Sequence, residues 1–439
     1  MATRLKVLMS AYACEPSKGS EPEVGWQWAL QMARFHDVTV LTRSNNRPAI
    51  EPVLNLLQSR QPLPQFVYHD CRPLLVKFKR RFKATKSYYV LWQRSAQQVV
   101  RQLQQAHHFD LLHHVTFAAF RYPTAIWEQG APSIWGPVGG IESIPTPLLP
   151  WRHPVSLIHE IPRNAHNFLH TSLFPALRRR ARASTLLLAT TREMQVAFAK
   201  LGFDAEIMPT IGLRTAELPW QPHRRPEGSL KLLFVGNIIT LKGLDLALEA
   251  LKASGADATF TLVGTGNYLD AAQQLASSLG LGQRVTFLGR LAREAVLKVY
   301  RDYDIFLFPS LHDTGGYAVI EAMVNELPVI CLDCGGPAVA VRDNCGIKVS
   351  LGPRAKVISD LAAAIRSYHQ NRAAVVEHGH QARESVLRYY EWERKGEQMN
   401  ECYLAAVSGF STRRRNVSTR DPTSSSPELT MQRGVGKRQ

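Results

Sequence analysis

The chain has 439 residues, 45% of them hydrophobic, which is enough for two domains with separate cores. Its six cysteines are too few for a disulfide framework, so we expect a reducing, cytoplasmic setting, and no run of about eighteen apolar residues predicts a membrane-spanning helix. The formal net charge of +17 lies mainly in residues 71–109, with nine basic and no acidic residues, and in the polar stretch 411–439. No nucleic-acid reading motif accompanies this charge, so no nucleic-acid partner is expected.

Short apolar segments alternate with longer amphipathic segments along the chain. This alternation predicts parallel strands with helices on both faces of each sheet. The first series predicts strands at 5–12, 37–43 and 109–116 and helices at 21–35 and 86–105. The second series predicts strands at 230–236, 258–264, 284–289, 304–310 and 327–333 and helices at 243–254, 268–280, 293–303 and 317–325. Two such series predict two doubly wound α/β domains.

A cluster of prolines around "HRRPEGS" marks the junction between the two series. We place the first domain at 1–212, the linker at 213–229 and the second domain at 230–384. Residues 385–408 predict a final helix. Residues 409–439 are polar and basic, and this composition predicts a disordered tail.

In doubly wound sheets, ligands bind beyond the carboxyl ends of the strands, so the loops that follow strands hold the candidate site residues. The first such loop has Gly19 and Ser20 at a helix start, where free amides and the helix dipole favour a phosphate. The alternative is an ordinary helix start. Lys242 stands at a similar helix entry in the second domain and reaches a phosphate as a point charge, unless it is one more surface lysine.

Gly264 and Gly266 follow another predicted strand and open a helix, much like a dinucleotide-binding fingerprint. Leu269 occupies the place of the third glycine, and the next strand ends without the acidic residue that holds a ribose. The pattern therefore argues against a Rossmann dehydrogenase. The glycines still allow a ligand to approach the backbone closely.

The stretch "HDTGGYAVIEAM" follows a buried strand and places two carboxylates around a glycine turn. We expect the amides of Gly315 and Gly316 to cradle an anionic group. Asp313 and Glu321 are suited to accept hydrogen bonds from sugar hydroxyls. The alternative is that Asp313 caps the turn and Glu321 is solvated.

Together these motifs resemble those of the retaining GT-B glycosyltransferases of family four. The likeness is specific over residues 232–346, where "LFVGNIITLKG", "FTLVGTGNY", "DTGGYAVIE" and "ELPVICLDCGGPAVAV" follow the family order. The segments "ACEPSKGSEPEVGWQWA", "HHVTFAAFRYPT" and "IWGPVGG" are similar to a bacterial subgroup. The resemblance implies two Rossmann-like domains facing across a cleft. The second domain would bind the donor and the first the acceptor, with the last helix crossing back to the first.

The resemblance implies a metal-independent, retaining transfer from a UDP- or GDP-linked sugar to a glycan or lipid-linked acceptor, without a cofactor. Glu321 then corresponds to the carboxylate that binds the ribose, Asp313 to the one that contacts the donor sugar, and Lys242 to the phosphate-binding loop. A histidine is expected against the donor sugar or acceptor, namely His114 or, alternatively, His113. The predicted donor-site residues are Gly19, Ser20, Asn237, Lys242, Gly264, Arg290, Asp313, Gly315, Gly316 and Glu321.

The chain departs from the family pattern at two positions. Asp313 stands where the family has Glu, and Asn237 stands where it has Arg. The loss of that charge predicts a compensating cation, Arg290 or Lys18, or weaker binding of the diphosphate. A non-catalytic binding protein and a sugar-nucleotide epimerase of the same fold therefore stay open as alternatives.

Residues 76–94, "VKFKRRFKATKSYYVLWQR", combine clustered cations with aromatic residues. Such a mixture suits the anionic surface of a membrane, with cations at the headgroups and aromatics at the interface. The segment predicts peripheral attachment at the inner face of the plasma membrane. The alternatives are a solvated basic helix and a site for an anionic soluble sugar.

Overall fold

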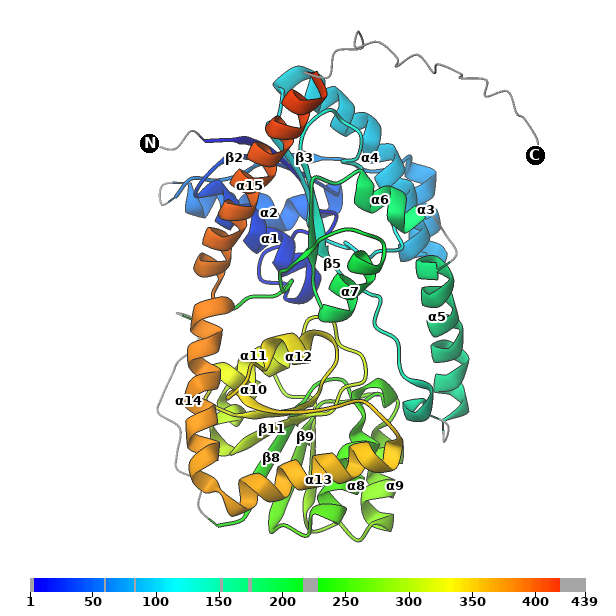
Figure 1. Cartoon of the computed structure of the whole chain (residues 1–439), viewed down its shortest axis with the longest axis vertical. Coiled ribbons are helices and arrows are strands. Elements are labelled where there is room, and N and C mark those ends of the chain that lie inside the picture. The colour runs from blue at the N-terminus through cyan, green and yellow to red at the C-terminus, as the bar shows by residue number, and fades with distance from the viewer. Residues whose placement is uncertain are drawn as a thin grey trace, which may run out of the picture.

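A computed structural model describes residues 4–58, 61–82, 84–150, 153–172, 176–215 and 228–418. It has two lobes stacked end to end, each built on one parallel sheet (Figure 1). This confirms the predicted fold of two doubly wound α/β domains. Of the predicted linker, residues 216–227 lie outside the described residues, as does the part of the predicted tail from 419 to 439.

The sheet of the first domain has seven strands in the order β3-β2-β1-β4-β5-β6-β7, and every pair is parallel. Its inner strands read as apolar runs because helices cover both faces of the sheet. The strands are β1 (Lys6–Ser10), β2 (Asp37–Thr42), β3 (Gln65–Tyr68), β4 (Leu111–His114), β5 (Ser133–Val138), β6 (Leu186–Ala189) and β7 (Glu206–Ile207). The helices are α1 (Ser20–Ala33), α2 (Arg47–Leu57), α3 (Pro73–Phe82), α4 (Thr85–His107), α5 (Pro154–Ser172), α6 (Ala176–Arg182) and α7 (Arg192–Lys200).

The sheet of the second domain has six parallel strands in the order β10-β9-β8-β11-β12-β13. The chain order reverses direction between β8 and β11, which is where ligands bind in folds of this kind. The strands are β8 (Leu230–Val235), β9 (Ala258–Val263), β10 (Val285–Gly289), β11 (Ile305–Phe308), β12 (Val329–Leu332) and β13 (Gly346–Val349). The helices are α8 (Leu244–Ser254), α9 (Leu269–Ser278), α10 (Arg293–Val299), α11 (Tyr317–Val324), α12 (Gly335–Ala340), α13 (Arg354–Gln370) and α14 (Arg372–Tyr389).

The last helix, α15 (Trp392–Ser418), runs from the second lobe along the side of the first (Figure 1). Trp392 packs edge-on against Trp28 of α1, with 5.2 Å between ring centroids. The predicted final helix, 385–408, is divided between the end of α14 and α15, and α15 continues past residue 408 to Ser418. Part of the predicted disordered tail is therefore helical.

A second connection lies on the opposite side of the molecule, where α5 reaches from the first lobe to the second (Figure 1). The hydroxyl groups of Ser156 and Thr240 are 2.8 Å apart, and the ring of His153 meets that of Tyr268 edge-on at 4.7 Å. These contacts hold the start of α5 against the second domain. The two lobes are thus joined on both sides of the space between them.

Candidate active site

A cavity of about 890 Å³ lies between the two domains, and we call it the cleft. Its walls are the loops at the carboxyl ends of strands, as expected for doubly wound sheets. It brings together eight of the predicted donor-site residues, from both domains. These are Gly19, Ser20, Asn237, Lys242, Asp313, Gly315, Gly316 and Glu321.

Lys242 and Asp313 form an ion pair inside the cleft. The Lys242 Nζ lies 2.5 Å from Asp313 Oδ2, with the two side chains only 14% and 19% exposed. The same ammonium group lies 4.9 Å from the centre of the Phe308 ring, at the end of β11. The lysine is therefore held at the centre of the site rather than free in solvent.

The residue after Lys242 explains why this loop approaches β11 so closely. Gly243 has a φ of +63°, and a Cβ at this position would lie 2.2 Å from the carbonyl oxygen of Pro309. Only glycine avoids both the strained backbone and the clash. The "KG" pair therefore positions Lys242 beside the loop that contains Asp313.

Asp313 has a second role that corrects one prediction. Its Oδ1 accepts hydrogen bonds from the backbone amides of Gly315 and Gly316, at 3.1 and 2.7 Å. These amides were predicted to be open for an anionic group, and here they are occupied. Aspartate two or three residues before free amides closes such a turn readily. Asp313 thus caps the turn and pairs with Lys242 at the same time.

Glu321 is buried on α11, so the alternative that it is solvated is wrong. Its Oε1 lies 3.0 Å from Arg293 Nη1, and its Oε2 accepts a hydrogen bond of 3.2 Å from the Tyr300 hydroxyl. Burial raises the pKa of Glu321, and the Arg293 guanidinium partly offsets this. Sequence reasoning missed Arg293, which begins α10 and lines the cleft.

The first domain contributes the loop before α1 and the first turn of that helix. Gly19 has a φ of +69° and precedes the helix, and Lys18 pairs with Glu15 at 2.8 Å. Glu21 accepts a hydrogen bond from the Phe117 amide, and burial raises its pKa. Glu23 accepts one from Gln27 through Oε1, while its buried Oε2 has no hydrogen-bond partner among the described residues. This wall of the cleft therefore includes an unsatisfied carboxylate oxygen.

Two predicted donor-site residues lie outside the cleft. Gly264 is required by backbone packing, because a Cβ there would lie 1.9 Å from the carbonyl oxygen of Gly236. Arg290 is exposed in the loop before α10 and does not line the cavity. Of the two cations proposed to compensate for Asn237, Lys18 lines the cleft and Arg290 does not. Arg293, one helical turn further on, stands where Arg290 was expected.

His114 does not line the cleft, contrary to the prediction. Its Nε2 lies 3.2 Å from the Tyr89 hydroxyl, which itself donates to the Phe117 carbonyl. His113 is equally buried, between the Tyr403 hydroxyl at 2.7 Å and the Gly136 carbonyl at 2.9 Å. Alternation along a strand suggested that one of them faces a ligand, but both faces of this sheet are covered.

A contact between the domains was also missed at the sequence level. Glu142, in the loop after β5, is buried and accepts hydrogen bonds from Thr191 at 3.0 Å and from Thr314 at 3.3 Å. His312 approaches the same carboxylate at 3.8 Å. Burial lowers the pKa of His312 to about 4, so this ring is neutral at pH 7. Thr314 and His312 flank Asp313, so this contact fixes the loop that forms the centre of the cleft.

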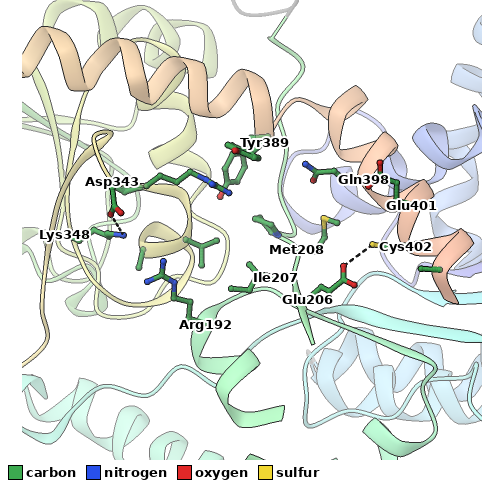
Figure 2. A pocket seen from close by; sticks show the side chains of 17 residues that line it. Arg192, Glu206, Ile207, Met208, Asp343, Lys348, Tyr389, Gln398, Glu401 and Cys402 are labelled. Carbon is green, nitrogen blue, oxygen red and sulfur yellow. Dashed lines mark hydrogen bonds and ion pairs between the residues drawn. The ribbon is translucent and has the colours of Figure 1, made fainter. Parts of the chain in front are cut away.

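A different cavity, of about 650 Å³, is also lined by residues of both domains (Figure 2). Residues 206–209 line it, whereas the next residues of the same segment, 210–214, line the cleft. In Figure 2, Arg192 and Lys348 lie on one side of it and Glu206 and Glu401 on the other. None of the predicted site residues lines this cavity.

Nothing in the described part of the chain groups three or more His, Cys, Asp or Glu side chains closely enough to hold a metal ion. The six cysteines are all buried and free. Burial raises the pKa of Cys331 to about 12, so this thiol is protonated at neutral pH. The cysteines of the "CLDC" stretch therefore pack within the second domain.

Comparison with known proteins agrees with this geometry. Residues 220–385 match the family described as glycosyl transferases group 1. D-inositol 3-phosphate glycosyltransferase of Mycobacterium marinum is 32% identical over 219 residues, which cover 48% of this chain and 46% of the relative. The chain thus matches about half the length of such curated relatives.

Two solved structures share the fold over nearly the whole chain. Sucrose-phosphate synthase from Thermosynechococcus elongatus aligns with a TM-score of 0.57 and 16% identity, covering 95% of this chain and all of that one. HepE from Anabaena, solved in complex with UDP and glucose, aligns with a TM-score of 0.53 and 17% identity, covering 92% of this chain and all of that one. The second domain therefore matches the group 1 glycosyltransferases, and the chain as a whole has the GT-B fold.

Proposed function

We propose that the protein transfers a sugar from a nucleotide-sugar donor to a glycan or lipid-linked acceptor, with retention at the anomeric carbon and without a metal ion. One observation carries the proposal: eight predicted donor-site residues, from both domains, surround a single cavity at the carboxyl ends of the strands. The match of residues 220–385 to the group 1 glycosyltransferases supports the reaction class. The fold shared with HepE, which was solved with UDP and glucose, makes a UDP-sugar the first donor to test.

In this proposal Glu321 binds the ribose hydroxyls of the donor. Its carboxylate is buried and already oriented by Arg293 and Tyr300. A preorganised carboxylate accepts two hydrogen bonds from a diol without rearrangement.

Lys242 stabilises the departing diphosphate in the same proposal. Its ammonium group is mostly shielded from water, where a positive charge acts more strongly on developing negative charge. It pairs with Asp313, and the proposal requires the bound diphosphate to lie within reach of the same ammonium group. Asp313, held by the amides of Gly315 and Gly316, then remains fixed to contact the donor sugar.

The cleft has its own cations in place of a metal ion. Lys18, Lys242 and Arg293 all line it, and each lies within reach of a carboxylate that a ligand can replace. Loss of the family arginine at Asn237 leaves Lys242 as the cation of the phosphate loop. The proposal therefore makes catalysis depend strongly on this one lysine.

The test is incubation of the purified chain with UDP- and GDP-linked sugars, without acceptor. A transferase hydrolyses its donor slowly, whereas a binding protein retains affinity but releases no sugar. Hydrolysis of one donor class, undiminished by a metal chelator, supports the proposal. Binding of a nucleotide sugar without any turnover, with acceptors of several classes present, supports the non-catalytic alternative.

We further propose that the first domain attaches to an anionic membrane at the cytoplasmic side. No helix in the described ranges is long and apolar enough to span a bilayer, so the attachment would be peripheral. On α3, Leu74 and Phe82 are 75% and 62% exposed, and on α5 Ile158 is 69% exposed. Exposed apolar side chains beside a cluster of cations suit the interface of an anionic bilayer.

This attachment is tested by flotation with vesicles that contain phosphatidylglycerol. Neutralising Lys79, Arg80, Arg81 and Lys83 together should remove most of the binding at low salt, since each cation contributes about 1 kcal/mol near such a surface. Lys83 lies outside the described residues, and the side chains of Lys79 and Arg80 are not described either. Absence of vesicle binding by the unaltered chain at low salt contradicts the proposal.

A further inference from the structure

A strongly basic cavity of about 440 Å³ lies in the first domain, separate from the cleft. It is formed by α4, α6 and the loop 121–128, and we call it the basic pocket. Its charged lining residues are Arg94, Arg121, Arg179, Arg180 and Glu128. Four arginines against one glutamate give the lining a formal charge of +3.

Two of these arginines have no counter-ion among the described residues. Arg94 and Arg179 are exposed at the rim, and neither makes an ion pair or a side-chain hydrogen bond with any described residue. Glu128, the acid of the lining, is exposed and likewise pairs with none of the arginines. Like charges gathered around one space repel each other unless an anion enters between them.

The other two arginines are held in place by their neighbours. Arg180 donates through Nη1 to the Phe120 carbonyl at 2.8 Å, and its guanidinium lies 5.8 Å from the centre of the Trp127 ring. Arg121 donates to Asn167 and lies 4.9 Å from the ring centre of Phe120. Burial lowers the pKa of Arg180, and the neighbouring Arg179 lowers it further. The pocket thus combines two fixed guanidinium groups with two that have no partner in the described part of the chain.

A short chain of contacts joins the basic pocket to the cleft. Asn167, the partner of Arg121, donates to the backbone carbonyls of Ile141 and Glu142, at 3.1 and 3.3 Å. The Glu142 carboxylate in turn accepts from Thr314, the residue after Asp313. The position of Arg121 in the basic pocket is therefore linked, through Asn167 and Glu142, to the loop that contains Asp313.

From these contacts we propose that the basic pocket binds a phosphate or diphosphate group, and that this group belongs to the acceptor. One planar guanidinium group can donate two parallel, charge-assisted hydrogen bonds to the oxygens of a phosphate group. The assignment to the acceptor rests on the proposed transferase function, whereas binding of the anion does not. An acceptor held by its phosphate on Arg94 and Arg179 would extend past Arg121 toward the donor sugar.

Calorimetric titration of the full chain with inorganic pyrophosphate at low salt tests the pocket. The double variant Arg94→Gln, Arg179→Gln should weaken binding by about tenfold or more, since it removes two charge-assisted contacts. The matched control is Arg101→Gln, Arg182→Gln, which removes the same charge from exposed positions of the same two helices outside the lining. This control should bind within about twofold of the unaltered chain, because only long-range charge is lost.

The Lys242→Ala variant separates this site from the cleft, because pyrophosphate held in the pocket stays bound when the cleft lysine is removed. Vesicles with phosphatidylglycerol form the second arm. Weakening specific to Arg94 and Arg179 in the pyrophosphate arm assigns a free phosphate group, and in the vesicle arm alone it assigns a lipid headgroup. Equal behaviour of the two double variants in both arms, or no binding in either, overturns the proposal. If the unaltered chain binds pyrophosphate in the basic pocket but hydrolyses no donor, the proposed function is overturned and the pocket is not.

Discussion

The cleft and the basic pocket are lined by the same number of cations but differ in how those charges are balanced. Lys18, Arg214, Lys242 and Arg293 in the cleft face four carboxylates, those of Glu21, Glu23, Asp313 and Glu321. The basic pocket has four arginines and one glutamate. A ligand of the cleft must replace existing ion pairs, so hydrogen bonding and shape decide its affinity. A ligand of the basic pocket supplies the missing counter-charge.

Replacing Lys242 tests the balanced cleft most severely. Lys242→Ala should lower turnover by about 10²- to 10³-fold, the usual effect of losing one preorganised charge-stabilising group. It also leaves Asp313 without its ion-pair partner. The measurement is the rate of donor hydrolysis or transfer under saturating donor.

Lys252→Ala is the matched control for that experiment. Lys252 lies near the end of α8, is exposed and does not line the cleft. Its removal should leave turnover within about twofold, because solvent and salt largely screen an exposed charge outside the cleft. Equal losses in the two variants would remove Lys242 from the proposed role.

Replacing Glu321 and replacing Asp313 should affect the binding of different ligands. Glu321→Gln should weaken binding of UDP itself by about ten- to a hundredfold, the value of one or two hydrogen bonds to a charged group. Asp313→Asn should leave UDP affinity nearly unchanged and weaken only the nucleotide sugar. Asparagine retains Oδ1 for the amides of Gly315 and Gly316, so the turn is preserved. Calorimetry with both ligands distinguishes the roles, and the reverse pattern would exchange them.

These carboxylates could be predicted because the strands of the second domain are easy to recognise in the sequence, and the site residues lie in the loops that follow them. Buried parallel strands form apolar runs, and the loops after them contain "NIITLK" and "DTGGYAVIE". What could not be predicted is which polar groups are already satisfied. The amides of Gly315 and Gly316 are engaged by Asp313, and Gly264 serves the approach of two backbones. Such contacts depend on differences of a few tenths of an ångström in the distance between two atoms, and the spacing of residues along the chain does not encode these differences.

The first domain was harder to predict. Its strands β3, β4, β6 and β7 span only two to four residues, too few for a clear periodicity. His114 was assigned to the cleft from the family resemblance, yet helices cover both sides of its strand, β4. Arg293 and Glu142 lie outside the quoted motifs, and their partners are distant in sequence. The basic pocket likewise joins Arg94 of α4 to Arg179 of α6, 85 positions later in the sequence.

The buried histidines predict a loss of stability in acid. Burial lowers the pKa of His113 to about 4, below the usual value near 6.5. The unfolded chain therefore binds more protons than the folded chain between these values, and stability falls as the pH drops through this window. The loss is about 1.4 kcal/mol per pH unit for each such histidine.

His114 offers a direct check, since burial lowers its pKa to about 3. His114→Gln should make the pH dependence of the unfolding free energy shallower by about one proton between pH 6 and pH 4.5. His107→Gln, at the exposed end of α4, is the matched control and should leave the slope unchanged. Urea unfolding at several pH values measures both. A slope unaffected by His114→Gln would show that the ring is not held neutral by burial.

Ionic strength should produce the smallest effect and separates the two cavities most directly. Salt screens the attraction between an anion and an uncompensated positive lining, and it affects a lining of balanced ion pairs less. Raising salt from 50 to 500 mM should weaken pyrophosphate binding to the basic pocket by about fivefold or more, and UDP binding to the cleft by about two- to threefold. The pocket value comes from the Lys242→Ala chain, in which the cleft has lost the lysine of its phosphate loop while the pocket keeps all four arginines. If salt weakens the binding of both ligands equally, the proposed difference in charge balance between the two cavities is wrong.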